Sequence, residues 1–155
     1  MIDYSIIIKR ISGFRKYFSF TKATDSDILY LKGLNLSDDI IDFYKKYNPK
    51  NIFEINGIRL LSINKIKEEN NDYTPGYILC PRGYCVIAST IFGDVYCVDT
   101  KTKENSIYIA SHDEIDEEAL ELDNKIIFIT DNFLDFLNKF VDGKLVKEFY
   151  DLTNK

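Results

Sequence analysis

The chain has 155 residues, of which 45% are hydrophobic and 29% are charged. This composition is typical of a soluble globular protein and excludes an intrinsically disordered one. The net charge of −5 argues against nucleic-acid binding, because contacts to phosphates need a clustered excess of Lys and Arg. The length is typical of one domain, so we expect residues 1–155 to fold as a single unit.

The cysteines Cys80, Cys85 and Cys97 are odd in number, stand at no zinc-binding spacing and lie in apolar runs. We expect free core thiols in a reducing compartment. The sequence shows neither a signal-peptide pattern nor the ~18 apolar residues of a membrane span, so we expect a cytoplasmic protein. Lys far exceeds Arg, and Ile and Asn are abundant, which favours A/T-rich codons and points to a bacterial genome.

The first predicted element is an amphipathic helix over residues 2–18, with Ile7, Ile11, Phe14 and Phe18 along one stripe. The basic residues that fall mostly on its other side are Lys9, Arg10, Arg15 and Lys16. Such a helix can bind a membrane surface. A helix that lies on a sheet with a solvated basic face is the more common arrangement, and we expect that one and no membrane contact.

Two further helices follow in the N-terminal third. Thr24 or Asp25 can begin a short helix that ends near Gly33. Ser37 can cap a longer one, whose acidic first turn and basic last turn match the helix dipole. Asn48-Pro49 ends that helix.

The middle of the chain changes to the short apolar runs of β-strands. Asn56-Gly57 predicts a hairpin, and a helix over residues 62–70 and a polar loop over residues 70–76 follow it. The next short runs predict an antiparallel meander, because their connections are too short for parallel crossovers. These predicted strands are Tyr77–Cys80, Cys85–Thr90, Val95–Thr100 and Ile107–Ala110.

Two of these runs form a hairpin around Gly93 and Asp94. We expect Asp94 to bond the backbone amides of its own turn, and Asp99 to do the same at its strand end. After an apolar run at residues 126–129, Thr130 or Asp131 opens a last helix with a wide apolar face that includes Phe133. The order predicts an α+β fold: an antiparallel sheet of about five to six strands, with N-terminal helices and one C-terminal helix packed on it.

Catalytic chemistry has few candidates. The only histidine, His112, stands beside Asp113 and Glu114, and we expect it to be an exposed loop residue. A Cys–His pair with Cys85 or Cys97 is conceivable, but no basic group stands beside either thiol to lower its pKa. We therefore expect no enzyme, no cofactor and no metal; a small hydrolase using Cys97 or His112 is the least favoured hypothesis.

The most biased stretch follows His112. Its seven carboxylates are Asp113, Glu114, Asp116, Glu117, Glu118, Glu121 and Asp123. One interpretation is a solvated loop or short helix held down by Ile115, Ala119 and Leu122. The other is a docking surface for a basic partner, because a single-sign patch speeds association with a cationic target. The charge pattern alone does not decide between them.

Four stretches, in this order, are similar to the SUKH superfamily of immunity proteins and cell-wall regulators. They are LSDDIIDFYKKY at residues 36–47, IRLLSINKIKEEN at 58–70, IASTIFGDVYCVDT at 87–100 and ITDNFLDFLNKF at 129–140. Each motif is degenerate by itself, and their order and spacing carry the resemblance, which spans about residues 25–142.

The resemblance implies an α+β domain without catalytic residues, in which Gly93, Asp94, Asp99 and Phe133 are structural positions. Many bacterial members bind a cognate polymorphic toxin, often a nuclease, and block it. We therefore expect an immunity protein that occludes a toxin with a basic surface. The alternative is a non-catalytic regulator or scaffold in cell-wall or stress signalling, as in fungal relatives.

Overall fold

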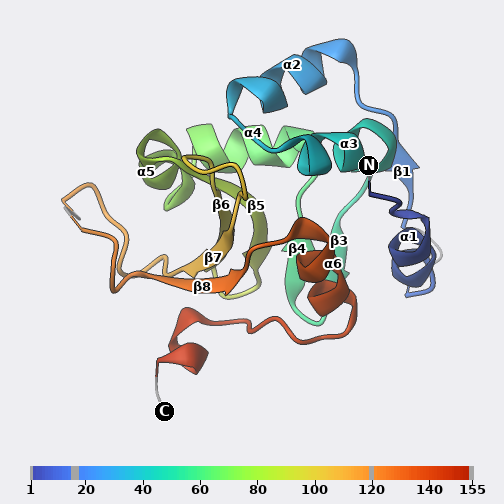
Figure 1. Cartoon of the computed structure of the whole chain (residues 1–155). Helices are drawn as coiled ribbons and strands as arrows, with labels where there is room; N and C mark the ends of the chain where they lie inside the picture. The colour runs from blue at the N-terminus through green and yellow to red at the C-terminus, as the bar shows by residue number, and fades with distance from the viewer. Residues whose placement is uncertain (1, 15–17, 119–120, 154–155) are drawn as a thin grey trace.

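A computed structural model describes residues 2–14, 18–118 and 121–153 of the chain. These residues form an α+β fold in which helices pack on an antiparallel sheet, as the sequence predicts (Figure 1). The helices are α1 (Ser5–Ser12), α2 (Asp25–Gly33), α3 (Asp38–Tyr47), α4 (Ile63–Asn71), α5 (Gly76–Leu79), η1 (Cys80–Arg82), α6 (Phe133–Val141) and η2 (Phe149–Leu152). The strands are β1 (Phe20–Thr21), β2 (Asn48–Pro49), β3 (Phe53–Ile55), β4 (Ile58–Leu60), β5 (Tyr84–Thr90), β6 (Val95–Asp99), β7 (Ile107–Ala110) and β8 (Ile126–Thr130).

The main sheet is an antiparallel meander of six strands in the order β3-β4-β5-β6-β7-β8, which contains three of the four predicted meander strands, the predicted hairpin and the apolar run at residues 126–129. Every neighbouring pair is antiparallel. Asn56 and Gly57 form the β3–β4 turn, with φ angles of 52° and 80°. Positive φ at both turn positions defines the type I′ hairpin turn that Asn-Gly favours, which explains why this dipeptide predicts the hairpin correctly.

The predicted strand Tyr77–Cys80 is wrong, because this segment forms α5 and continues into η1. Four apolar residues are too few for periodicity to separate a strand from a buried helical turn. Gly76 makes the helical path possible: α5 begins so close to the end of α4 that a Cβ at this position would lie 1.9 Å from the carbonyl oxygen of Glu69.

The predicted helix over residues 2–18 is shorter than expected. It ends as α1 at Ser12, followed by Gly13, and Phe18 instead stacks on Phe53 with ring centroids 4.4 Å apart. Arg15 and Lys16 of its expected basic face lie outside the described residues. Arg10 forms an ion pair with Asp142 at the end of α6, so α1 lies beside a helix rather than on the sheet.

The helix starts follow the sequence closely. Thr24 caps α2 in a capping box with Asp27, Ser37 caps α3, and Ser62 caps α4. The exception is α6, whose N-cap is Asn132 and not Thr130 or Asp131. Thr130 is the last residue of β8, so the helix cannot begin there. None of the described helices is long and apolar enough to cross a membrane.

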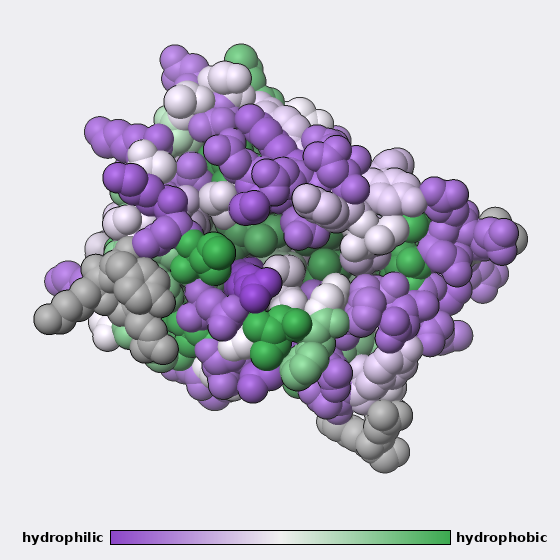
Figure 2. Space-filling view, turned by 180° about the vertical axis from the view of Figure 1, so that it is seen from behind, coloured by the Kyte–Doolittle hydropathy of each residue, from purple (hydrophilic) through white to green (hydrophobic). Residues whose placement is uncertain are grey.

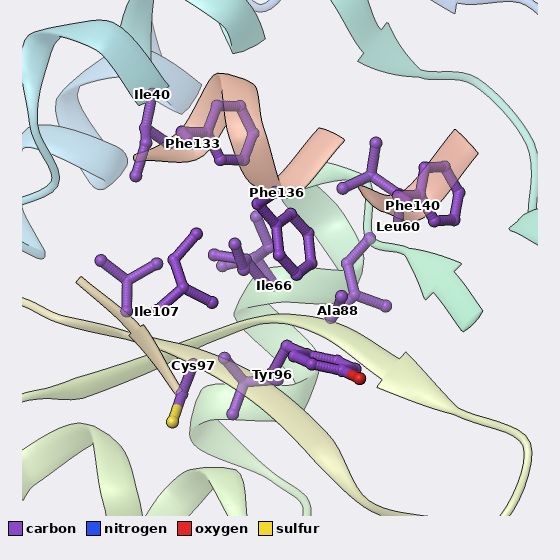
Figure 3. Close-up of a cluster of buried hydrophobic side chains, with 14 of the residues drawn as sticks. Ile40, Leu60, Ile66, Ala88, Tyr96, Cys97, Ile107, Phe133, Phe136 and Phe140 are labelled. Atoms are coloured by element: carbon purple, nitrogen blue, oxygen red, sulfur yellow. The ribbon is translucent and has the colours of Figure 1, made fainter. Parts of the chain in front are cut away.

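The hydrophobic core joins α6 to the sheet. Figure 3 shows aromatic side chains of α6 facing residues of the strands, and the ring centroids of Phe136 and Tyr96 are 5.4 Å apart. Phe133 is buried and contacts the rings of Tyr4 and Phe43. Cys97 points away from this cluster, on the other side of β6 (Figure 3).

Asn70 completes the sheet where β4 ends. Its amide oxygen accepts the N–H of Val86 at 2.8 Å, and its amide nitrogen donates to the carbonyl of the same residue at 2.9 Å. The side chain is buried and also donates to the carbonyl of Ile66. Asn70 therefore belongs to α4 and does not open the polar loop that the sequence predicts, and it pairs with β5 much as a strand would.

Asp94 has long-range partners, contrary to the expectation of local ones. Its side chain is only 3% exposed. It accepts hydrogen bonds from the backbone N–H of His112 at 2.9 Å, from Nδ1 of the same residue at 2.6 Å, and from the backbone N–H of Phe149 at 2.7 Å. The backbone N–H of Thr90 donates to the carbonyl of Asp94, and the N–H of Gly93 donates to the carbonyl of Thr90. These bonds close the β5–β6 turn and leave the Asp94 carboxylate available to reach other segments.

Two other residues of this hairpin, Gly93 and Asp99, are also structural positions that the family resemblance implies. Gly93 has φ of 96°, which L side chains rarely adopt, and the ring of His112 lies 3.4 Å from where its Cβ would stand. Asp99 accepts the backbone N–H of Lys101 at 2.8 Å, as expected for a residue at a strand end, and its side chain also pairs with the ammonium of Lys101 at 3.1 Å.

Replacing Gly76 with Ala tests the approach of α5 to α4. The added Cβ would collide with a carbonyl oxygen, so we expect the free energy of unfolding to fall by about 1–3 kcal/mol. The matched control is Gly33→Ala, whose Cβ would meet nothing within 4 Å and should change stability by less than about 1 kcal/mol. Urea denaturation measures both; equal stabilities would contradict the packing described above.

Replacing Asp94 with Ala removes the acceptor for two backbone amides and one ring nitrogen. Because buried donors without an acceptor are costly, we expect a loss of about 2–4 kcal/mol in the free energy of unfolding. Asp113→Asn is the control, since that side chain is 61% exposed and should contribute less than about 0.5 kcal/mol. Thermal or chemical denaturation compares them, and a mild Asp94→Ala phenotype would refute this role.

Candidate functional site

The acidic segment, residues 113–123, connects β7 to β8 through a series of turns. All seven of its carboxylate residues are exposed. No helix forms in its described part, residues 113–118 and 121–123, so of the two expected forms it is a loop. In Figure 2, which views the molecule from behind, the side that carries the connection between β7 and β8 is at the right and is largely hydrophilic.

Apolar residues hold the segment against the protein. Ile115 is buried in the core cluster, and Leu122 is half-buried against it. Ala119, the third expected anchor, lies outside the described residues. The carbonyl of Leu122 accepts the N–H groups of Lys125 and Ile126 at 2.8 and 3.1 Å, which ties the end of the segment to the start of β8.

Two tyrosine hydroxyls orient carboxylates of the segment. Tyr77 of α5 donates to Glu117 at 2.6 Å, and Tyr150 of η2 donates to Glu114 at 2.9 Å. The hydrogen bond to Glu117 raises the pKa of the Tyr77 phenol, because ionisation would place two negative charges together. The sequence contains no signal for either pair, since the partners stand 40 and 36 residues apart.

His112 positions the start of the segment. The expectation of a simple exposed loop residue is incomplete, because the side chain is 40% exposed and lies between two carboxylates. Its Nδ1 contacts Asp94, and its Nε2 lies 3.2 Å from an oxygen of Asp113. The hydrogen bonds between Asp94 and His112 therefore fix where the acidic segment leaves the sheet.

The negative charge of the segment is not neutralised within the described part of the chain. The ion pairs that Lys and Arg form there involve other carboxylates, such as Asp27, Glu54 and Asp142. Asp116 accepts the backbone N–H of Glu118 at 3.0 Å, which orders the turn without removing charge. The segment therefore presents oriented carboxylates of one sign at the surface of the protein.

The buried cysteines do not offer a nucleophile. Burial raises the pKa of Cys97 to about 12 and raises that of Cys85 well above its ordinary value. Both thiols are free, buried and protonated at neutral pH, whereas a reactive cysteine needs a lowered pKa. Within the described residues, His, Cys, Asp and Glu form no group of three or more that could hold a metal ion.

Comparison with known proteins supplies the family. The model of the SMI1/KNR4 family (SUKH-1) matches residues 23–139. It includes the first three stretches that resemble the superfamily and all but the last residue of the fourth. No curated protein matches the chain. Because the matched region covers more than half of the sequence and contains both the β5–β6 hairpin and the acidic segment, the chain belongs to the SMI1/KNR4 family (SUKH-1).

Proposed function

We propose that this protein is a cytoplasmic immunity protein that binds a cognate toxin stoichiometrically and blocks it. The SMI1/KNR4 family covers both immunity proteins and cell-wall regulators and is generally non-catalytic. The observation that carries the proposal is the acidic segment, residues 113–123, whose exposed carboxylates have no Lys or Arg partner in the described part of the chain.

The chemistry of the segment suits a basic target. A toxin that cleaves nucleic acid needs a positive site for phosphate oxygens, and carboxylate oxygens are the protein groups that can occupy such a site. Binding of the acidic segment would therefore block the site at which such a toxin holds the phosphates of its substrate. The hydrogen bonds from Tyr77 and Tyr150 hold Glu117 and Glu114 in place before binding, which lowers the entropy lost when the complex forms.

The same family membership supports a second candidate, a non-catalytic regulatory scaffold in cell-wall or stress signalling. The two candidate functions predict different genes beside the gene for this protein. An adjacent toxin gene, and rescue of cells from that toxin by co-expression of this protein, supports immunity. Absence of such a gene, with stable association to enzymes of the host, supports the regulator.

Charge reversal in the acidic segment tests the proposed binding mode. For the triple variant Glu117→Lys, Glu118→Lys and Glu121→Lys, we expect association with the co-expressed toxin to slow by about tenfold or more at low salt, because steering is lost. The salt dependence of the association rate should flatten, while the dissociation rate changes less. Stopped-flow or surface plasmon resonance measurements at several salt concentrations give both rates.

A control variant carries the same change in net charge on other elements. It combines Asp25→Lys, Asp72→Lys and Glu104→Lys, whose side chains are exposed and lie outside the segment. We expect a smaller effect, because charges beyond about 10 Å from the contact are screened. Equal slowing by both triple variants would show that only net charge matters, and unchanged association would remove the acidic segment from the proposal.

A further inference from the structure

The last strand of the main sheet has an open edge. Among the described residues, β8 is hydrogen-bonded to a strand only on its β7 side. Ile126, Ile127 and Ile129 are half-buried, and Phe128 is 54% exposed. The N–H and C=O groups along such an edge are a template for one more strand.

The opposite edge of the sheet differs. There β3 has three residues, and its Phe53 is buried under the rings of Phe18 and Phe20, at 4.4 and 4.8 Å between centroids. The N-terminal segment therefore covers the β3 end of the sheet. No comparable cover is seen over Phe128 of β8 in the described residues.

The sequence of β8, IIFIT, lacks two of the devices that usually protect an exposed edge. Such edges commonly carry a Lys, a Pro or a bulge that prevents association. In β8 there is no charge and no proline. The register shift in its pairing with β7 lies at the Thr130 end, and Ile126–Phe128 pair regularly with Tyr108–Ala110.

A row of aromatic rings leads to this edge. Tyr84 of β5, Tyr108 of β7 and Phe128 of β8 meet edge to face, with 5.8 Å between the centroids of each neighbouring pair. Lys101 closes the inner end of the row, with its ammonium 3.6 Å from the centroid of Tyr84. Phe128 is the exposed outer end, where a side chain of an added strand would extend the row.

Charge identifies the kind of strand that fits. The acidic segment ends at Asp123, just before β8, and Asp131 follows the strand, so an apolar edge has carboxylates at both ends. Between Glu121 and Asp131 the only basic residue is Lys125. A second copy pairing with β8 would bring its own acidic segment close to this one in parallel pairing, or close to Asp131 in antiparallel pairing, and either arrangement opposes self-association.

We propose that β8 and the described carboxylates of the acidic segment form one docking surface, on which an extended partner segment with apolar residues at its centre and basic residues at both ends pairs as a seventh strand. Main-chain hydrogen bonds along β8 would hold the segment, and Phe128 would contact its apolar residues. Its basic residues would face the acidic segment and Asp131. The inference rests on the proposed function only in taking the partner to be a basic protein.

A peptide probe tests this surface without the toxin. The probe is a short synthetic Lys–Val peptide, with valines at its centre and lysines at both ends, compared with a Glu–Val peptide of the same length that has Glu in place of each Lys. With the Lys–Val peptide we expect the β8 amides that point away from β7 to exchange their hydrogens on the order of tenfold more slowly, as pairing protects them. With the Glu–Val peptide exchange should not change.

Two variants connect the effect to the edge. Phe128→Lys adds an edge-protecting charge at an exposed position and should abolish the protection, and the neutral Phe128→Thr should weaken peptide binding roughly fivefold. Ile52→Lys is the control, because Ile52 is 65% exposed away from β8 and should bind the peptide normally. Circular dichroism checks that all three variants fold.

The possible outcomes separate this inference from the proposed function. Protection at other strands, equal protection by both peptides, or concentration-dependent protection of β8 without peptide would overturn it, the last because a second copy then occupies the edge. If the Phe128→Lys variant still neutralises a toxin, with an unchanged dissociation rate, then strand addition at β8 is wrong and the immunity proposal stands. If the peptide protects β8 and no toxin is neutralised, the docking surface stands and the immunity proposal fails.

Discussion

The carboxylate of Asp94 is the constraint on which the arrangement of the proposed docking surface depends. It joins the β5–β6 turn, the end of β7 at His112 and the C-terminal tail at Phe149 through three hydrogen bonds. A buried acceptor with three donors holds these segments more firmly than apolar contact would, because each unpaired donor would be costly. The acidic segment begins one residue beyond this junction, so its position follows from the hairpin.

The surface that results combines two kinds of interaction. In the complex we propose, the oriented carboxylates would act over a distance and set how fast a cationic partner arrives. The edge of β8 would act at contact, through main-chain groups and the exposed ring of Phe128. Their adjacency comes from the bonds that tie Leu122 to the start of β8. The proposed surface would thus combine rapid association with a lasting contact.

Much of the fold could be predicted from local sequence, because its signals are local. Thr24, Ser37 and Ser62 cap helices through side chains that bond amides three residues away, and Asn56-Gly57 determines its own turn. The segment at Tyr77 could not be predicted in this way, because its helical form depends on the close approach of Gly76 to Glu69. That contact cannot be read from four apolar residues.

The sequence by itself determined the α+β class, the meander, the family resemblance and the presence of a dense acidic stretch. Only the tertiary structure decided which carboxylates are held by Tyr77 and Tyr150, that Asp94 reaches Phe149, and that β8 has no second partner strand among the described residues and lies beside the acidic segment. The physical reason is range. Caps, turns and periodicity act within a few residues, whereas these contacts join segments 36 to 55 residues apart, and only packing brings them together.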